Sequence, residues 1–373
     1  DLGVLFFFKY SGLASGLPLG ISFYTFQIMA YVIDVYRGRI PAEQSLLRLG
    51  TYLTMFPQLI SGPITNYADV RVALGRERTI KARQLEEGMK LLIIGLAAKV
   101  VIADRIGTLW NSIRMIGFDS ISTKLAWMGA FAYSLQLYFD FAGYSMMARG
   151  IGKMLGFELP VNFRYPYISK SVTEFWRRWH ISLSSWLRDY IYIPLGGNRK
   201  GTAKKYRNLI VVFLISGLWH GASWSFVLWG LFHALLQIFE QIIHLSKKAS
   251  NSIIRFLKII LNFVLITISW VFFKITDVKQ ALAILQKALF FPSFKLNIDL
   301  LKISPKELSI ALFFILIIVI LDLLRNHFDM IKWFRKRNFV FRFLIYILLF
   351  SSFLILGVYG TGYDANQFIY IQF

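Results

Sequence analysis

Long runs of apolar residues, interrupted by short basic stretches, dominate the pattern along this chain. They lie at Leu17–Val35, Leu46–Ile64, Met89–Ile102, Leu125–Met147, Leu209–Ile243, Ile253–Phe273, Leu308–Leu324 and Phe341–Tyr359. Near the last of them, the stretch from Phe343 to Tyr363 contains no charged side chain, which suits the roughly 20 residues that a helix needs to cross a bilayer. We therefore predict an all-α, polytopic transmembrane helix bundle with about nine or ten passes.

One apolar run is too long for a single pass. Asn208 to Phe239 comprises 32 residues without a formal charge, and as one helix it would measure about 48 Å against a hydrocarbon core of roughly 30 Å. We predict a break at Gly221–Ser223, because glycine is a poor helix former. His220 directly precedes this break and, counted from Arg207, lies about 20 Å along the helix, inside the hydrocarbon depth.

The segment from Arg164 to Asn208 is both basic and aromatic. It carries ten Lys and Arg residues against Glu174 and Asp189, so it should face the cytoplasm. Within it, large apolar residues recur at intervals of three and four and predict one amphipathic or re-entrant helix at the cytoplasmic interface. These residues are Trp176, Trp179, Leu183, Trp186 and Tyr190. Ser171 and Glu174 form a predicted capping box at the start of this helix.

Composition and charge refine this picture. Recurrent apolar blocks with short connections over 373 residues indicate one membrane domain, 1–373. Because the chain starts at Asp1 and continues with the apolar Leu2–Phe8, we expect the first N-terminal helices of the bundle to be missing. The net charge of +22 sits between the apolar blocks, where it serves topology and membrane lipid, so we expect no nucleic-acid partner.

Missing residue types narrow the possible chemistry. The chain has no cysteine, which excludes disulfides, Cys-ligated zinc and a cysteine acyl-enzyme. No His-x-x-x-His or Glu-x-x-His pair is present, so we expect no metal site, and no G-x-S-x-G motif marks a nucleophilic serine. Gly196–Gly201 lacks the features of a phosphate-binding P-loop and is predicted to be a turn, although it is basic enough to contact a phosphorylated cofactor.

Two histidines are the leading catalytic candidates. An ionisable residue inside a membrane segment is a functional candidate by default, and His220 could take a proton from an attacking hydroxyl. The alternative is a neutral histidine that bonds a neighbouring helix. His180, on the predicted interface helix, could line a cytoplasmic entrance or be structural.

Other polar residues in apolar surroundings are assigned structural roles. His233, His244 and His327 have no supporting surroundings. Asp140 needs a partner at depth, such as Arg149 or a hydroxyl group.

Two unusual strings carry a family resemblance. Glu174–Trp186 resembles the signature cytoplasmic segment of bacterial membrane-bound O-acyltransferases, and Ser216–Trp224 resembles their intramembrane active-site segment. Further matching strings lie at Pro18–Phe23, Phe56–Pro63, Tyr192–Gly197 and Phe368–Phe373. The chain thus resembles the membrane-bound O-acyltransferase family, and within it the alginate O-acetylase-like branch. One departure is Met146, where relatives often carry an acidic residue.

The resemblance implies His220 and His180 as the catalytic pair in a tunnel through the bundle. It implies no permanently bound cofactor, but acetyl-coenzyme A or an acyl-carrier thioester as the donor substrate, arriving from the cytoplasm. Residues that could form the donor entrance are Arg177, Arg178, Trp179, Arg199 and Lys200.

The resulting function is a multi-pass O-acyltransferase of the bacterial cytoplasmic membrane. It would move a small acyl group, acetyl in the first instance, to an extracytoplasmic glycan such as an exopolysaccharide or peptidoglycan, together with a partner acyltransferase. D-alanyl transfer to teichoic acid is an alternative within the same chemistry. A glycan transporter or flippase is an alternative of another class.

Overall fold

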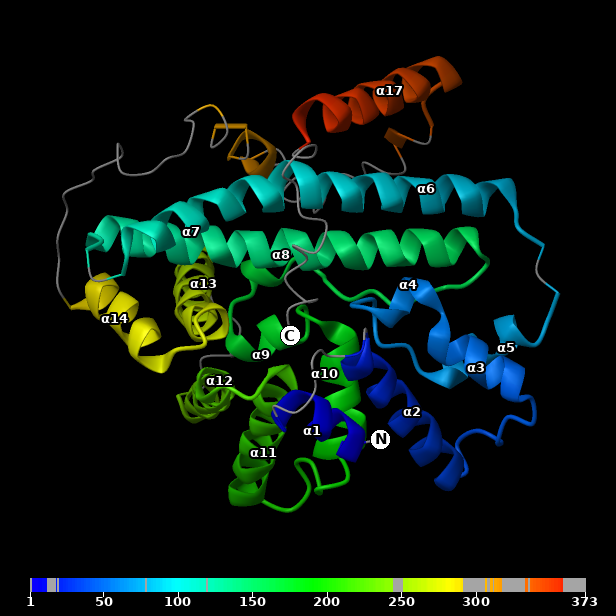
Figure 1. Ribbon diagram of the computed structural model, residues 1–373, viewed down its shortest axis with the longest axis horizontal. Helices are drawn as coiled ribbons and strands as arrows, with labels where there is room; N and C mark the ends of the chain where they lie inside the picture. Colours follow the sequence, from blue (N-terminus) through cyan, green and yellow to red (C-terminus); the bar gives the residue numbers. More distant parts are fainter. Residues whose placement is uncertain are drawn as a thin grey trace.

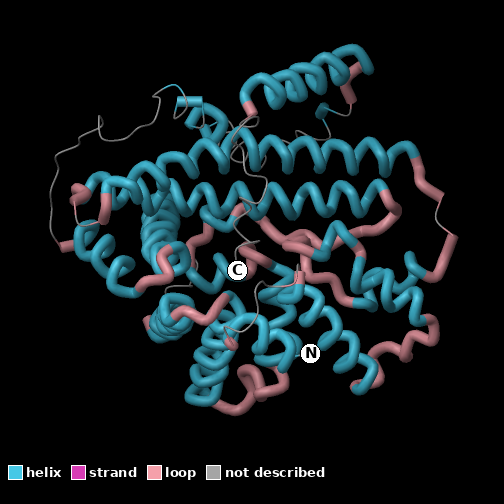
Figure 2. The backbone as a smooth tube through the Cα atoms, in the orientation of Figure 1, coloured by secondary structure: helices cyan, strands magenta, loops and turns pink. Residues whose placement is uncertain are grey.

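The computed structural model describes residues 2–11, 18, 20–77, 79–118, 120–243, 251–290, 306, 309–310, 312–316, 333–334 and 336–357. Helices and connecting loops make up these ranges, and none of them contains a strand (Figure 2). The prediction of an all-α protein is confirmed.

The helices follow one another with short connections over most of the chain (Figure 1). Those before the long central pair are α1 (Leu2–Tyr10), α2 (Ile21–Tyr36), α3 (Leu46–Thr54), α4 (Phe56–Leu59) and α5 (Tyr67–Leu74). One member of the central pair is formed by three consecutive elements: α6 (Ala82–Ala97), the π-helix η1 (Ala98–Ala103) and α7 (Asp104–Ile116). The other member is α8 (Thr123–Met154). The remainder are η2 (Pro166–Ile168), α9 (Val172–Trp176), α10 (Ile181–Leu187), the π-helix η3 (Arg188–Tyr192), α11 (Thr202–His220), α12 (Trp224–Ile242), α13 (Ser252–Lys274), α14 (Val278–Leu289) and α17 (Phe339–Leu356).

Glycines let α6 and α8 run side by side and antiparallel (Figure 1). A methyl group added at Gly95 would lie 2.4 Å from the carbonyl oxygen of Gly143, and one added at Gly150 would lie 2.5 Å from that of Gly88. The two contacts are seven residues apart on each helix, which is two turns. Small residues at such positions allow helix backbones to approach closely in membranes.

A buried ion cluster lies beside this glycine contact. Lys99, in the π-helix η1, places Nζ 2.6 Å from Asp104 and 2.7 Å from Asp140, and all three side chains are almost completely buried. Asp140 therefore pairs with Lys99 and not with Arg149, which donates from Nε to the carbonyl oxygen of Leu159. The reason is distance, since nine residues along a helix separate Arg149 from Asp140 by about 13 Å.

The predicted break in the long apolar run is confirmed. Helix α11 ends at His220, Gly221 is extended at φ 171° and ψ 173°, and α12 begins at Trp224 behind the N-cap Ser223. The two helices then pack closely, because a methyl group added at Gly230 would lie 2.3 Å from the carbonyl oxygen of Phe213. His220 is thus the last residue of α11, directly before the interruption.

The predicted continuous helix over the basic segment is wrong. Its residues form α9, a turn, α10 and then η3, and the turn contains His180 at a positive φ of 42°. The apolar stripe is buried in the protein core, where Trp179 and Leu183 are each 1% exposed. The side chain of Ser171 does accept from the backbone N–H of Glu174, but the Glu174 carboxylate accepts from Lys170 instead of Ser171.

The apolar run Leu46–Ile64 is also divided. Helix α3 ends at Thr54, Met55 is extended, and the four-residue α4 follows with Pro57 near its start. Proline lacks the N–H that a continuing helix would need, which explains a new start at this point.

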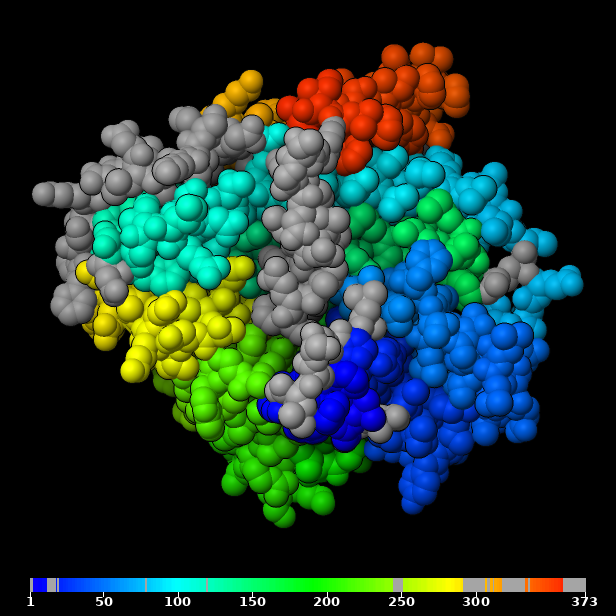
Figure 3. All heavy atoms as spheres, viewed as in Figure 1, coloured from blue at the N-terminus to red at the C-terminus, as the bar shows by residue number. Residues whose placement is uncertain are grey.

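Three described helices are long and apolar enough to cross a membrane, judged by length and composition: α12, α13 and α17. Helix α17 lies on the outside of α6 (Figure 3), and none of its residues is buried. It is tied to α6 through Arg342, whose guanidinium lies 2.8 Å from Glu86. The number of passes stays a prediction, and most of Leu308–Leu324 and all of 358–373 lie outside the described residues.

We predict that Lys99→Met lowers the free energy of unfolding by about 3–5 kcal/mol, because Asp104 and Asp140 would stay buried without their ammonium partner. Thermal unfolding in detergent measures this. The matched control is Lys90→Met, which removes a more exposed pair with Glu86 on the same helix and should cost about 0.5 kcal/mol. Equal shifts for the two variants would contradict a central role for the ion cluster.

Candidate active site

His180 occupies the turn between α9 and α10. Its backbone is left-handed, at φ 42° and ψ 54°, a region that residues other than glycine rarely adopt and that marks local strain. Asn162 stabilises the turn from a distant part of the chain, since its carbonyl oxygen accepts from the N–H of Ile181 at 2.9 Å. The side chain of His180 is consequently fixed inside the protein, with 1% of its surface exposed.

The side-chain oxygen of Asn162 determines the tautomer of His180. Oδ1 of Asn162 accepts from the backbone N–H of Ser182 at 3.1 Å and from the Ser182 hydroxyl at 2.9 Å. That hydroxyl in turn accepts from the N–H of Ile64. Because Oδ1 can only accept, Nδ1 of His180, at 3.2 Å, must be the donor. In the neutral ring, Nε2 is then the nitrogen that accepts.

His220 lies in an aromatic enclosure. Its ring centroid is 4.8 Å from Trp219, 4.9 Å from Phe273 and 5.2 Å from Trp229, and the residue is 3% exposed. These rings come from α11, α12 and α13, so three helices converge on the histidine. The enclosure keeps bulk water away from the imidazole, which strengthens electrostatic interactions there.

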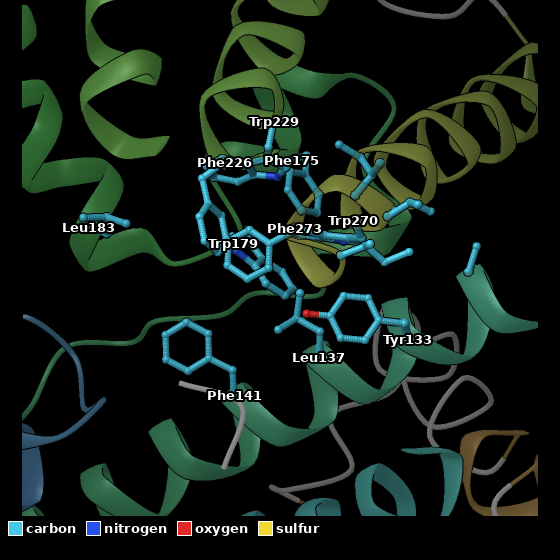
Figure 4. Close-up of a cluster of buried hydrophobic side chains, with 14 of the residues drawn as sticks. Tyr133, Leu137, Phe141, Phe175, Trp179, Leu183, Phe226, Trp229, Trp270 and Phe273 are labelled. Carbon is cyan, nitrogen blue, oxygen red and sulfur yellow. The ribbon is translucent and has the colours of Figure 1, made fainter. Parts of the chain in front are cut away.

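The structure brings His220 and His180 to one aromatic cluster. Trp229, beside His220, lies 6.0 Å from Trp270, and Trp270 lies 4.9 Å from Trp179, the residue before His180. Figure 4 shows this cluster facing Tyr133, Leu137 and Phe141 of α8, and the Phe141 ring lies 4.8 Å from the ring of His180.

The five residues expected at a donor entrance lie in different surroundings. Arg177, Arg199 and Lys200 are exposed, as an entrance requires. Arg178 is half-buried and pairs with Glu174 at 2.6 Å. Trp179 is buried within the aromatic cluster and takes part in the site through Trp270 rather than through the surface.

His233 is a buried histidine with a structural contact. Its Nδ1 accepts from the indole N–H of Trp176 at 3.2 Å, and it is completely buried on α12. His244 and His327 lie outside the described residues. Within the described ranges, no three His, Asp or Glu side chains gather where they could hold a metal ion.

Sequence reasoning missed Asn162 and the rings of Trp270 and Phe273. Asn162 lies 18 positions before His180 in a segment without regular structure, so no periodicity marks it. Trp270 and Phe273 do share one helical face with Ile266, at intervals of four and three. That pattern alone could not distinguish the wall of a site from ordinary core packing.

A family model described as the membrane-bound O-acyltransferase family matches residues 39–278. The chain belongs to this family. The matched residues include both His180 and His220, and the family resemblance noted from the sequence is confirmed.

Three relatives of this family member have different named substrates. A probable alginate O-acetylase of Pseudomonas aeruginosa is 43% identical over 75% of this chain and 53% of its own length. A peptidoglycan O-acetyltransferase of Helicobacter pylori is 38% identical over 72% of this chain and 56% of its own length. A teichoic acid D-alanyltransferase of Bacillus subtilis is 34% identical over 58% of this chain and 57% of its own length. The chain spans about half the length of the curated relatives that it matches.

We predict that Asn162→Leu moves the hydrogen of the neutral His180 ring from Nδ1 to Nε2, because the acceptor at Nδ1 is removed. Nitrogen chemical shifts of histidine-labelled protein in lipid distinguish the tautomers, and His180→Gln identifies the signal. Asn162→Asp, which retains the acceptor, is the matched control and should keep the hydrogen on Nδ1. An Nε2 hydrogen in the wild-type protein would contradict the tautomer assignment.

Proposed function

We propose that this chain is an O-acyltransferase that moves an acetyl group from a thioester to a hydroxyl group of a glycan outside the bacterial cytoplasmic membrane. The observation that carries the proposal is the placement of His220 and His180 against one buried aromatic cluster. Membership of the family supports the reaction type. The names of two relatives, an alginate O-acetylase and a peptidoglycan O-acetyltransferase, support acetyl as the acyl group and a glycan as the acceptor.

In the proposed reaction, His220 is the general base. It takes the proton of the acceptor hydroxyl while the hydroxyl oxygen forms a bond to the thioester carbonyl carbon. The carbon–sulfur bond then breaks, the acetyl ester is released, and the proton passes to the departing thiolate. Nε2 of His180, the acceptor nitrogen of the neutral ring, orients a hydroxyl or shares the proton transfer. No covalent acyl-enzyme is needed, because both substrates meet within one enclosure.

The donor is proposed to be acetyl-coenzyme A or an acyl-carrier thioester that enters from the cytoplasm. The exposed Arg177, Arg199 and Lys200 supply positive charge for its phosphates. The acceptor reaches the site from the other side, with a partner acyltransferase completing delivery to the glycan. Membrane lipid surrounds the bundle. D-alanyl transfer to teichoic acid is the second candidate, favoured by the similarity to a D-alanyltransferase.

We predict that His220→Ala in the full-length protein abolishes acylation of the cell-surface glycan, a loss of about 10²–10⁴-fold if base catalysis is the function removed. Mass spectrometry of the glycan measures this and also distinguishes acetyl from D-alanyl esters. His233→Gln is the matched control, since it changes a buried histidine that contacts Trp176 and should retain transfer per folded molecule.

Two outcomes would contradict this proposal. Normal acyl content in His220→Ala would remove the proposed base. Intact acylation with a loss of glycan export would favour a transporter instead.

We also predict that 164–208 faces the cytoplasm, because ten basic residues strongly resist translocation of so short a segment. Lys204→Cys introduces a unique thiol into a chain without cysteine. A membrane-impermeant thiol reagent should label it in inverted vesicles and not in intact cells. Labelling of intact cells would reverse the proposed direction of donor entrance.

A further inference from the structure

Residues at the C-terminal end of α1 cap the C-terminal end of α11. The ammonium group of Lys9 donates to the carbonyl oxygen of Trp219, and the hydroxyl group of Tyr10 donates to that of Leu218. The last carbonyl groups of a helix have no partner inside the helix and form the negative end of its dipole. A cation and a hydroxyl donor at this position therefore stabilise the segment that ends in His220.

Lys9 also brings a positive charge close to His220. Its Nζ lies 5.5 Å from the centroid of the Trp219 ring, which lies 4.8 Å from the ring of His220. Phe23 and Phe26 cover the other sides of Trp219 at 5.6 Å and 5.1 Å. In such apolar surroundings a charge acts more strongly than it would in water.

A positive charge at this point favours the proposed transfer. When the acceptor oxygen attacks the thioester, the carbonyl oxygen gains negative charge, and this charge moves to the sulfur as the carbon–sulfur bond breaks. A fixed cation beside the site where negative charge develops lowers the barrier, because it needs no reorganisation during the reaction.

We propose that Lys9 is a positioning residue for acyl transfer. It anchors the end of α11, and its positive charge stabilises the negative charge that forms next to His220 during the reaction. The inference rests on the proposed function. It assigns a part of the active site to α1, which lies outside the segment matched by the family model.

A role in capping alone is the competing explanation, and Tyr10 separates the two. Tyr10→Phe removes a neighbouring hydrogen bond to α11 and leaves the charge, whereas Lys9→Met removes the charge and keeps the length of the side chain. Lys9→Arg retains the charge with a different donor geometry. Capping alone predicts similar effects for Lys9→Met and Tyr10→Phe.

The test uses the full-length protein in lipid vesicles, with acetyl-coenzyme A as donor and unacetylated alginate and peptidoglycan fragments as acceptors. Rates are expressed per folded molecule, judged by thermal unfolding. Lys9→Met should lower kcat by about 10²-fold with the KM for acetyl-coenzyme A nearly unchanged. Lys9→Arg should recover most of the rate, and Tyr10→Phe should stay within about threefold of the wild type, because it alters only one cap.

The results separate this inference from the proposed function. An active wild type, an inactive His220→Ala and a fully active Lys9→Met would overturn only the role of Lys9. The same holds if Lys9→Arg is no better than Lys9→Met, or if Lys9→Met and Tyr10→Phe reduce kcat equally. A wild type that transfers nothing to either acceptor would contradict the proposed function and with it this inference.

Discussion

The direct contact between the backbones of α6 and α8 is the constraint on which the rest of the structure depends. Glycines at Gly88, Gly95, Gly143 and Gly150 remove the side chains that would hold the helices apart. The close approach buries Lys99 with its two aspartates beside the seam. It also fixes the register of α8, and with it the face that carries Tyr133, Leu137 and Phe141 towards the aromatic cluster.

Around this rigid pair, the candidate active site is made from interrupted helices. His220 ends α11 before an extended glycine, and His180 sits in a left-handed turn between two short helices. Backbone N–H and C=O groups outside regular helices are tolerated at membrane depth only where the protein itself supplies their hydrogen-bond partners. Asn162 does so for the turn at His180, and Lys9 and Tyr10 do so for the end of α11. The interruptions thereby place both imidazoles against one aromatic cluster.

The aromatic rings have two functions in this arrangement. They fill the space between α9, α12 and α13 through contacts such as those of Trp270 with Trp179 and Trp229. They also give the imidazoles surroundings of low polarity, in which hydrogen bonds and nearby charges count for more than in water. The cluster is therefore both the core of this half of the molecule and the wall of the candidate site.

The amino-acid sequence by itself determined the helical class, the break after His220 and the two candidate histidines, because hydrophobic runs and glycine act locally along the chain. Tertiary structure decided what is distant in sequence. It paired Asp140 with Lys99 and broke the expected helix at His180. It also brought Asn162 to His180, and Lys9 to the end of the helix that carries His220. A spacing of three and four identified the stripe containing Trp179, but could not say whether it faced lipid or protein. That choice depends on which neighbouring helices cover the stripe, and no local pattern encodes it.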